Sequence, residues 1–121
     1  MPAKFEQYVA MVRDQGIEEL TVAQIGALRK AGAPMVIIDI REEHEREKTH
    51  SIKGAAAIPR GLLEMNIERY ARSPHDLIVL ICSDGMRSVL AADSLKRMGY
   101  ANPKALRGGF AALSAALERG Q

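Results

Sequence analysis

The sequence is poor in residues on which several classes of protein depend. It has one cysteine, Cys82, no tryptophan, two phenylalanines and three tyrosines among 121 residues. A single cysteine excludes an intramolecular disulfide and a metal site built from cysteines alone, and it suits a reducing compartment. The few aromatic rings offer little surface for stacking bases, and no block of Lys and Arg is present. The composition therefore argues against a nucleic-acid partner.

Long apolar runs are also lacking. No segment approaches the length of a membrane span, and the first four residues lead into an amphipathic pattern rather than into a signal-peptide core. Three histidines, His44, His50 and His75, show no ligand spacing with carboxylates or with Cys82. We therefore expect a cytoplasmic protein that associates with no membrane and holds no metal ion and no cofactor.

The chain is long enough for one hydrophobic core and too short for two. Residues 1–17 are predicted to contain an amphipathic helix, and residues 18–121 are predicted to form the domain proper. The helix places four apolar side chains at i, i+3, i+4 and i+7: Phe5, Tyr8, Val9 and Val12. This face has to pack on the domain's own core or on a partner, so we expect a monomer or a weak homodimer.

Strand and helix patterns alternate through the rest of the chain. The predicted strands are 18–20, 35–40, 55–58, 77–81 and 103–106, and a helical pattern follows each of them. This alternation predicts an α/β fold with an open, mostly parallel sheet of about five short strands and helices on both faces. In such sheets, ligands gather at the carboxyl ends of the strands.

The most informative stretch begins where the apolar strand 77–81 stops at Cys82. Four residues separate this thiol from Arg87, and the helical pattern then runs to Gly99. A short loop that leads into a helix can turn several backbone N–H groups toward one point, where the helix dipole favours negative charge. A thiolate at Cys82 would be favoured there, with Arg87 as a nearby cation and Gly85 allowing the tight curl. The alternative is an inert, buried cysteine next to an ordinary helix start.

Four segments of the sequence resemble the signatures of the single-domain rhodanese-like sulfurtransferases. The run Cys82-Ser83-Asp84-Gly85-Met86-Arg87-Ser88 is similar to their Cys-x-x-Gly-x-Arg loop. The other matching segments are Asp39–Glu42, Ile52–Pro59, and Met98–Tyr100 taken together with Leu106–Phe110. The resemblance covers about Leu20 to Leu117. Two departures are Thr49-His50-Ser51-Ile52, where the family has Gly-His-Ile, and Leu113 in place of a Trp.

The resemblance implies a set of site residues that agrees with the reading of the loop. It makes Cys82 and Arg87 catalytic, and the loop residues that would bind the substrate are Ser83, Asp84, Gly85, Met86 and Ser88. Asp39 lies at the end of a buried strand, where a carboxylate could be a catalytic acid or a structural group. The resemblance implies the structural role, so we expect Asp39 and Arg41 to be structural residues near the site. Arg60 leaves a neighbouring strand end, where it either attracts an anionic substrate or faces solvent.

Three functions are compatible with these residues, and we expect the first of them. The first is a sulfurtransferase that takes a sulfane sulfur from a small anionic donor such as thiosulfate, holds it as a Cys82 persulfide and gives it to an external thiol or cyanide. The thiol could belong to a partner protein. The second is a persulfide carrier or sensor module that docks on a partner without turnover. The third, a phosphatase or arsenate reductase with a Cys-loop-Arg cradle, is disfavoured because those enzymes place five residues between Cys and Arg.

Overall fold

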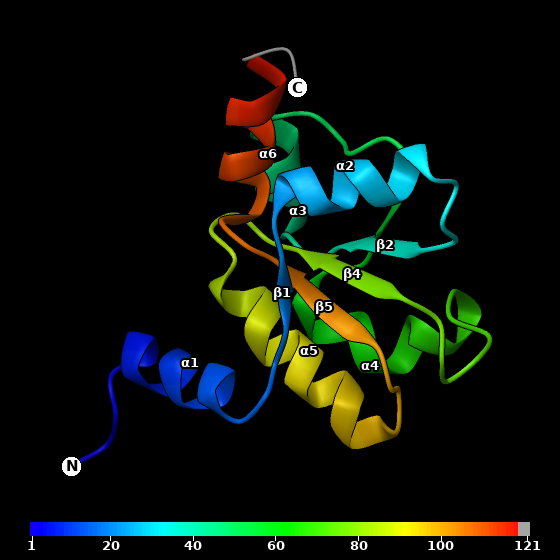
Figure 1. The fold of residues 1–121 in the computed structure, drawn as a ribbon. Helices are drawn as coiled ribbons and strands as arrows, with labels where there is room; N and C mark the ends of the chain where they lie inside the picture. Colours follow the sequence, from blue (N-terminus) through cyan, green and yellow to red (C-terminus); the bar gives the residue numbers. More distant parts are fainter. Residues whose placement is uncertain (119–121) are drawn as a thin grey trace.

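The computed structural model describes residues 1–118, and its centre is a five-stranded sheet. The strands are β1 (Glu19–Leu20), β2 (Val36–Asp39), β3 (Ala55–Ala57), β4 (Ile78–Ile81) and β5 (Pro103–Leu106). They lie in the order β1-β5-β4-β2-β3, and every pairing is parallel. The predicted open sheet is confirmed. Because all five strands run the same way, their carboxyl ends meet at one edge (Figure 1).

Helices follow the strands as the sequence predicts. They are α1 (Phe5–Asp14), α2 (Val22–Lys30), α3 (Glu43–Lys48), α4 (Leu63–Asn66), α5 (Met86–Met98) and α6 (Gly109–Glu118), with short 3-10 turns η1 (Arg60–Leu62) and η2 (Ile67–Arg69). Local signals set several of the ends. Thr21 and Gln24 bond each other's backbone N–H at the start of α2, and Gly99 ends α5 with a φ of 108°. Within residues 1–118, no helix is both long and apolar enough to cross a membrane.

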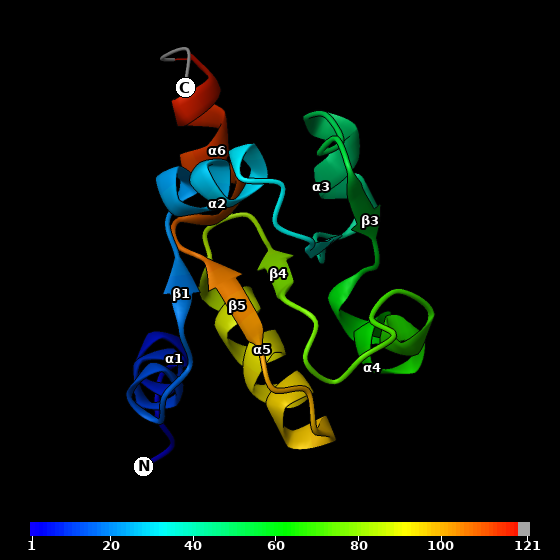
Figure 2. The same ribbon diagram turned by 45° about the vertical axis from the view of Figure 1, so that its right-hand side comes forward.

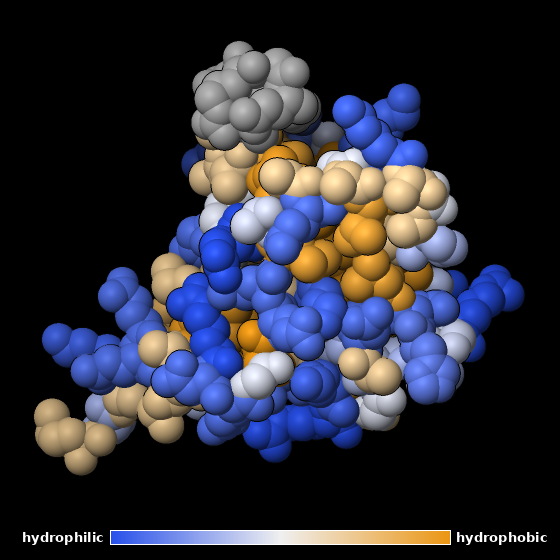
Figure 3. Space-filling view, in the orientation of Figure 1, coloured by the Kyte–Doolittle hydropathy of each residue, from blue (hydrophilic) through white to orange (hydrophobic). Residues whose placement is uncertain are grey.

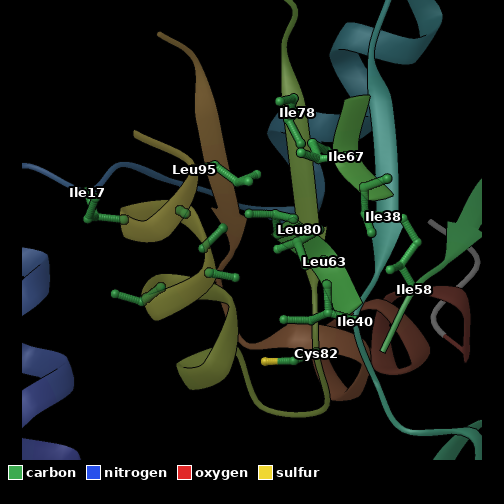
Figure 4. Packing of buried hydrophobic residues seen from close by; sticks show 14 of the residues in the cluster. Ile17, Ile38, Ile40, Ile58, Leu63, Ile67, Ile78, Leu80, Cys82 and Leu95 are labelled. Atoms are coloured by element: carbon green, nitrogen blue, oxygen red, sulfur yellow. The ribbon is translucent and has the colours of Figure 1, made fainter. Parts of the chain in front are cut away.

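Alternate residues of the central strands face two separate apolar clusters. Ile78, Leu80 and Cys82 point toward α4 and α5 and lie in the larger cluster (Figure 4). Val79 and Ile81 point the other way, toward α2 and α6. This alternation follows from the two-residue period of a strand. The helices therefore cover both faces of the sheet, and the turned view of Figure 2 shows α2 and α6 gathered on one side of β5 and β4.

The N-terminal helix α1 packs along α5. Val9 and Val12 are buried in the larger cluster, whereas Phe5 and Tyr8 leave about half of their surface exposed. The apolar face that the sequence predicts is thus divided: its inner half completes the core beside α5, and its outer half lies on the surface.

The face under α2 is less completely filled than the opposite one. A cavity of about 550 Å³ lies between α2 and the sheet, and Figure 3 shows apolar side chains gathered in a hollow there. Small residues of α2, namely Ala23, Gly26 and Ala27, form one wall, and Val79 and Ile81 contribute to the other. No residue of α2 is fully buried. The well-packed face is therefore the one that holds Cys82.

Candidate active site

Cys82 is the first residue after β4, and its side chain is fully buried at the carboxyl edge of the sheet (Figure 4). Its sulfur accepts a hydrogen bond from the backbone N–H of Gly85 at 3.1 Å. The thiol also donates to Asp84 Oδ1 at 3.8 Å. Gly85 has a φ of 94°, a left-handed conformation that residues with a Cβ rarely adopt, and this conformation lets the loop curl back over the sulfur. The loop therefore brings at least one backbone donor to the sulfur.

The first turn of α6 fixes the outer side of the same loop. Phe110 N donates to the carbonyl of Cys82 at 2.7 Å, and Ala111 N donates to the carbonyl of Ser83 at 3.1 Å. Gly109 makes this approach possible, because a Cβ built there would collide with the Cys82 carbonyl oxygen. For this segment, the sequence predicts only a helical pattern after the strand 103–106. The paired glycines at 108 and 109 are the signal that could have indicated a close contact between backbones.

Asp84 caps the helix that follows the loop. Its Oδ1 accepts a hydrogen bond from Met86 N at 3.0 Å, at the start of α5. The first turn of a helix leaves such N–H groups without partners inside the helix, and this is why the N-terminus of a helix attracts anions. Here the chain's own carboxylate takes that position. The anion cradle predicted at the start of α5 is therefore partly filled by Asp84.

Arg87 extends its side chain to Glu45 of α3 rather than to Cys82. Its two terminal nitrogens donate to the two carboxylate oxygens of Glu45 at 2.9 and 2.7 Å. Ser83 completes the cluster, because its hydroxyl donates to Glu45 Oε2 at 2.5 Å and lies 3.4 Å from Arg87 Nη2. The bidentate bond from Arg87, supported by Ser83, lowers the pKa of Glu45 to about 2 despite partial burial. Hydrogen bonding to Glu45 raises the pKa of Arg87.

Sequence reasoning missed Glu45. The helical pattern predicted after the strand 35–40 is present as α3. Its Arg46 donates to the carbonyl of Arg41 at 2.8 Å. Nothing local marks Glu45 among the other acids of α3, because its partner Arg87 is 42 residues away. Only the packing of α3 against the Cys82 loop singles it out.

Asp39 and Arg41 form a second ion pair at the carboxyl end of β2. Arg41 Nη2 lies 2.8 Å from Asp39 Oδ2, and both side chains are almost completely buried. The remaining donors of Arg41 reach Thr49 Oγ1 at 2.8 Å and the His50 carbonyl at 3.1 Å. Its guanidinium carbon lies 3.9 Å from the centre of the Phe110 ring. Since Phe110 also bonds the Cys82 carbonyl, this pair links the end of β2 to the loop.

Arg60 lies at the predicted rim, but its side chain is engaged elsewhere. Its backbone N–H bonds the Ile40 carbonyl at 3.1 Å, beside the strand end that carries Asp39. The guanidinium pairs with Glu64 at 2.9 Å, and Glu64 also accepts from Ser94 of α5 at 2.6 Å. Burial raises the pKa of Glu64, but the hydrogen bonds that Glu64 accepts from Ser94 and Arg60 lower the pKa by a larger amount. The pKa of Glu64 is therefore below its ordinary value. Among residues 1–118, the hydrogen bonds and ion pair of the Arg60 side chain go to Glu64 and not to the Cys82 loop.

Two other predicted loop residues complete the site. Met86 starts α5 and is partly buried. Ser88 is fully buried one turn into the helix, and its hydroxyl has no hydrogen-bond partner within the described residues. A buried hydroxyl without a partner costs free energy, so such groups are often found at functional sites. Among residues 1–118, no group of three His, Cys, Asp or Glu side chains is arranged to hold a metal ion.

Comparison with known families identifies the class of this domain. The family model described as "Rhodanese-like domain" matches residues 21–116. The chain therefore belongs to the rhodanese-like family, as its loop and fold indicate.

Relatives among curated proteins are larger than this chain. "Probable adenylyltransferase/sulfurtransferase MoeZ" of Mycobacterium tuberculosis is 30% identical over 114 residues, which are 89% of this chain and 29% of the relative. "Putative sulfur carrier protein YrkF" of Bacillus subtilis is 39% identical over 64 residues, which are 53% of this chain and 33% of the relative. The chain thus spans about a third or less of these relatives.

Solved structures share the fold over nearly the whole chain. A protein of unknown function from Rhodopseudomonas palustris CGA009, described as a possible tyrosine phosphatase, is 31% identical with a TM-score of 0.79, and the match covers 96% of both chains. A thiosulfate sulfurtransferase from Pseudomonas aeruginosa is 26% identical with a TM-score of 0.79, over 93% of this chain and 22% of that one.

Proposed function

We propose that this protein is a sulfurtransferase in which Cys82 carries the sulfur as a persulfide. The observation that supports this most directly is the placement of the single cysteine under the Gly85 N–H, in a loop held by α5 and α6. The proposed donor is an anionic sulfane sulfur compound such as thiosulfate, and the acceptor is a thiol or cyanide. The need for a reduced Cys82 fits the cytoplasm.

The reaction is two displacements at sulfur. The Cys82 thiolate attacks the outer sulfur of thiosulfate, a new S–S bond forms, the S–S bond of thiosulfate breaks and sulfite leaves with the electron pair. The product, Cys82–S–S⁻, is then attacked at its outer sulfur by a thiolate or cyanide, which leaves Cys82 as a thiolate again. The Gly85 N–H would bond the negatively charged sulfur in both steps.

The remaining loop residues are proposed to shape the pocket around this sulfur. Arg87 acts through Glu45 and Ser83, to which its side chain is bonded. The Ser88 hydroxyl has no hydrogen-bond partner among residues 1–118, and we propose that a persulfide on Cys82 accepts from it. Asp39 and Arg41 are proposed to support the loop through Phe110 without contact to the substrate. The acceptor has to be external, because the chain has no second cysteine that could resolve the persulfide.

Intact-mass measurement tests the proposal. After treatment with thiosulfate or with a persulfide, the protein should gain the mass of one sulfur, and a reductant should remove it. Cys82→Ser should gain none. Turnover of thiosulfate and cyanide to thiocyanate should accompany the labelling. Labelling of the Ser variant would contradict the role of Cys82.

A non-turnover sulfur carrier is the alternative, and it is supported by the relative that is named as a putative sulfur carrier. Rapid loading of Cys82 with negligible turnover to small acceptors would support the carrier.

Phosphatase activity is a further candidate because of the R. palustris neighbour. Only four residues separate Cys82 from Arg87, and Asp84 already bonds the Met86 N–H, so a phosphate would find little room. Hydrolysis of an aryl phosphate without sulfur transfer would favour that candidate.

A further inference from the structure

The positive groups predicted to receive an anionic donor are already bonded to carboxylates of the same chain. Both terminal nitrogens of Arg87 are held by Glu45. The Met86 N–H at the start of α5 is held by Asp84. Arg60, on the rim, is paired with Glu64. An incoming anion would have to displace one of these carboxylates or bind beside it.

The charges around the thiol therefore sum to a negative value. Arg87 contributes +1 and its partner Glu45 contributes −1, while Asp84 adds another −1, so these three groups give −1 before Cys82 ionises. Asp84 is in direct contact with the thiol, at 3.8 Å. Thiosulfate is a dianion, and a nearby carboxylate repels it more strongly than a donor with a smaller charge.

We propose that Asp84 and Glu45 set the donor specificity of the Cys82 site, against small dianions and in favour of sulfane sulfur carried on a thiol as a persulfide, R–S–S–H. This inference rests on the sulfurtransferase function proposed above. The Cys82 thiolate attacks the outer sulfur of the persulfide, a new Cys82 S–S bond forms, the donor's S–S bond breaks, and the inner sulfur leaves as R–S⁻ with the electron pair. Cys82 is oxidised to Cys82–S–S–H, in which the outer sulfur keeps its proton. The donor is reduced to R–S⁻, which takes up the proton that Cys82 released on ionising. Thiosulfate remains a usable but poorer donor.

Two isosteric variants remove the charges while keeping the architecture. Asp84→Asn keeps an oxygen that can accept from Met86 N, so the start of α5 stays capped. Glu45→Gln keeps one oxygen for Arg87 and releases the positive charge of that side chain toward the mouth of the loop. Asp14→Asn is the matched control, because Asp14 is an exposed acid at the end of α1.

The test compares kcat/KM for thiosulfate and for cysteine persulfide, each at low and high salt. For wild type, persulfide should be the better donor, and added salt should raise the rate with thiosulfate because it screens repulsion. In Asp84→Asn and in Glu45→Gln, the ratio of kcat/KM for thiosulfate to kcat/KM for persulfide should rise about tenfold, an amount in the range of one charge contact near a surface. The ratio cancels any loss of activity that both donors share. Asp14→Asn should keep the wild-type ratio.

Different results separate this inference from the proposed function. If salt lowers the wild-type rate with thiosulfate, or if both variants leave the ratio of the two donors unchanged, the specificity inference is wrong while sulfur transfer stands. If no donor loads Cys82, as judged by intact mass, the function and the inference fail together. A third donor, an unrelated protein with one persulfidated cysteine, identifies the source of the persulfide. Faster loading by it than by cysteine persulfide points to a protein donor, and the reverse points to a small thiol.

Discussion

Two arginine–carboxylate pairs flank the Cys82 loop, and they differ in their surroundings. Arg41 and Asp39 leave 1% and 2% of their side chains exposed, whereas Arg87 and Glu45 leave 30% and 22% exposed. The first pair is enclosed by Thr49, His50 and Phe110, and the second lies at the mouth of the loop with Ser83. Both use the bidentate fork of Arg, but the first pair is part of the core and the second is partly exposed to solvent.

The two pairs are therefore expected to affect different properties, the buried pair the stability of the fold and the half-exposed pair the reactivity of the site. Removing one member of a buried pair leaves a charge without water or a partner, so the folded state is penalised strongly. Removing one member of a half-exposed pair lets water replace the partner, so the cost to folding is small. Mutations of the first pair should therefore reduce stability, and mutations of the second should change chemistry in a protein that stays folded.

The largest effect is expected for Arg41→Ala. The buried Asp39 carboxylate would lose three of its hydrogen bonds, and Phe110 would lose the guanidinium above its ring. The free energy of unfolding should fall by about 3–5 kcal/mol, the usual cost of breaking a buried pair. Urea denaturation measures this change. Arg41→Ala combined with Asp39→Ala should recover part of the loss, and a double variant as unstable as the single one would contradict the argument.

The second largest effect is expected on turnover when Arg87 is replaced. Arg87→Lys keeps the positive charge but cannot reproduce two parallel bonds to Glu45, so it should lower kcat almost as much as Arg87→Ala, by about 10²-fold. The free energy of unfolding should fall by no more than about 1 kcal/mol in either variant. Steady-state kinetics with cysteine persulfide, together with thermal unfolding, test both statements. Full turnover by Arg87→Lys would show that charge alone is sufficient.

A smaller effect, on the stability of the fold, is expected when the pH is lowered. The pKa of Glu45 is about 2 in the folded protein, below its ordinary value of 4.5, so its ion pair stabilises the fold fully above pH 4.5. That contribution should be lost progressively as the pH falls from 4.5 toward 2. Unfolding experiments across this range should show a shallower loss of stability in Glu45→Gln than in wild type. Parallel curves for the two proteins would mean that the pair does not contribute to folding.

The smallest effect should come from the i,i+4 pair of Arg60 and Glu64. Partly exposed i,i+4 pairs of this kind contribute about 0.3–0.5 kcal/mol to stability, so Arg60→Ala should lower the free energy of unfolding only slightly. Because the guanidinium is bonded to Glu64, KM for thiosulfate should also change little. A large rise in KM that disappears at high salt would instead assign Arg60 to substrate attraction.

The sequence alone determined the scaffold because its signals are local. The five strands and the helix stop at Gly99 each depend on a few neighbouring residues, and the structure has all of them near their predicted positions. The position of Cys82 at the carboxyl edge followed in the same way, because a buried strand that leads into a loop and a helix fixes where that loop lies in a parallel sheet.

The tertiary structure alone decided which charges meet at the loop. Glu45 and Arg87 are 42 residues apart, and α3 contains other acids that local rules cannot distinguish from Glu45. The contact of Gly109 with the Cys82 carbonyl joins two further segments that no short pattern relates. A local pattern sets backbone conformation through neighbours in sequence, but an ion pair depends on where packing places two distant side chains. The partner of Arg87, the Glu45 carboxylate, is therefore determined by the packing of α3 against the loop and not by the sequence of the loop itself.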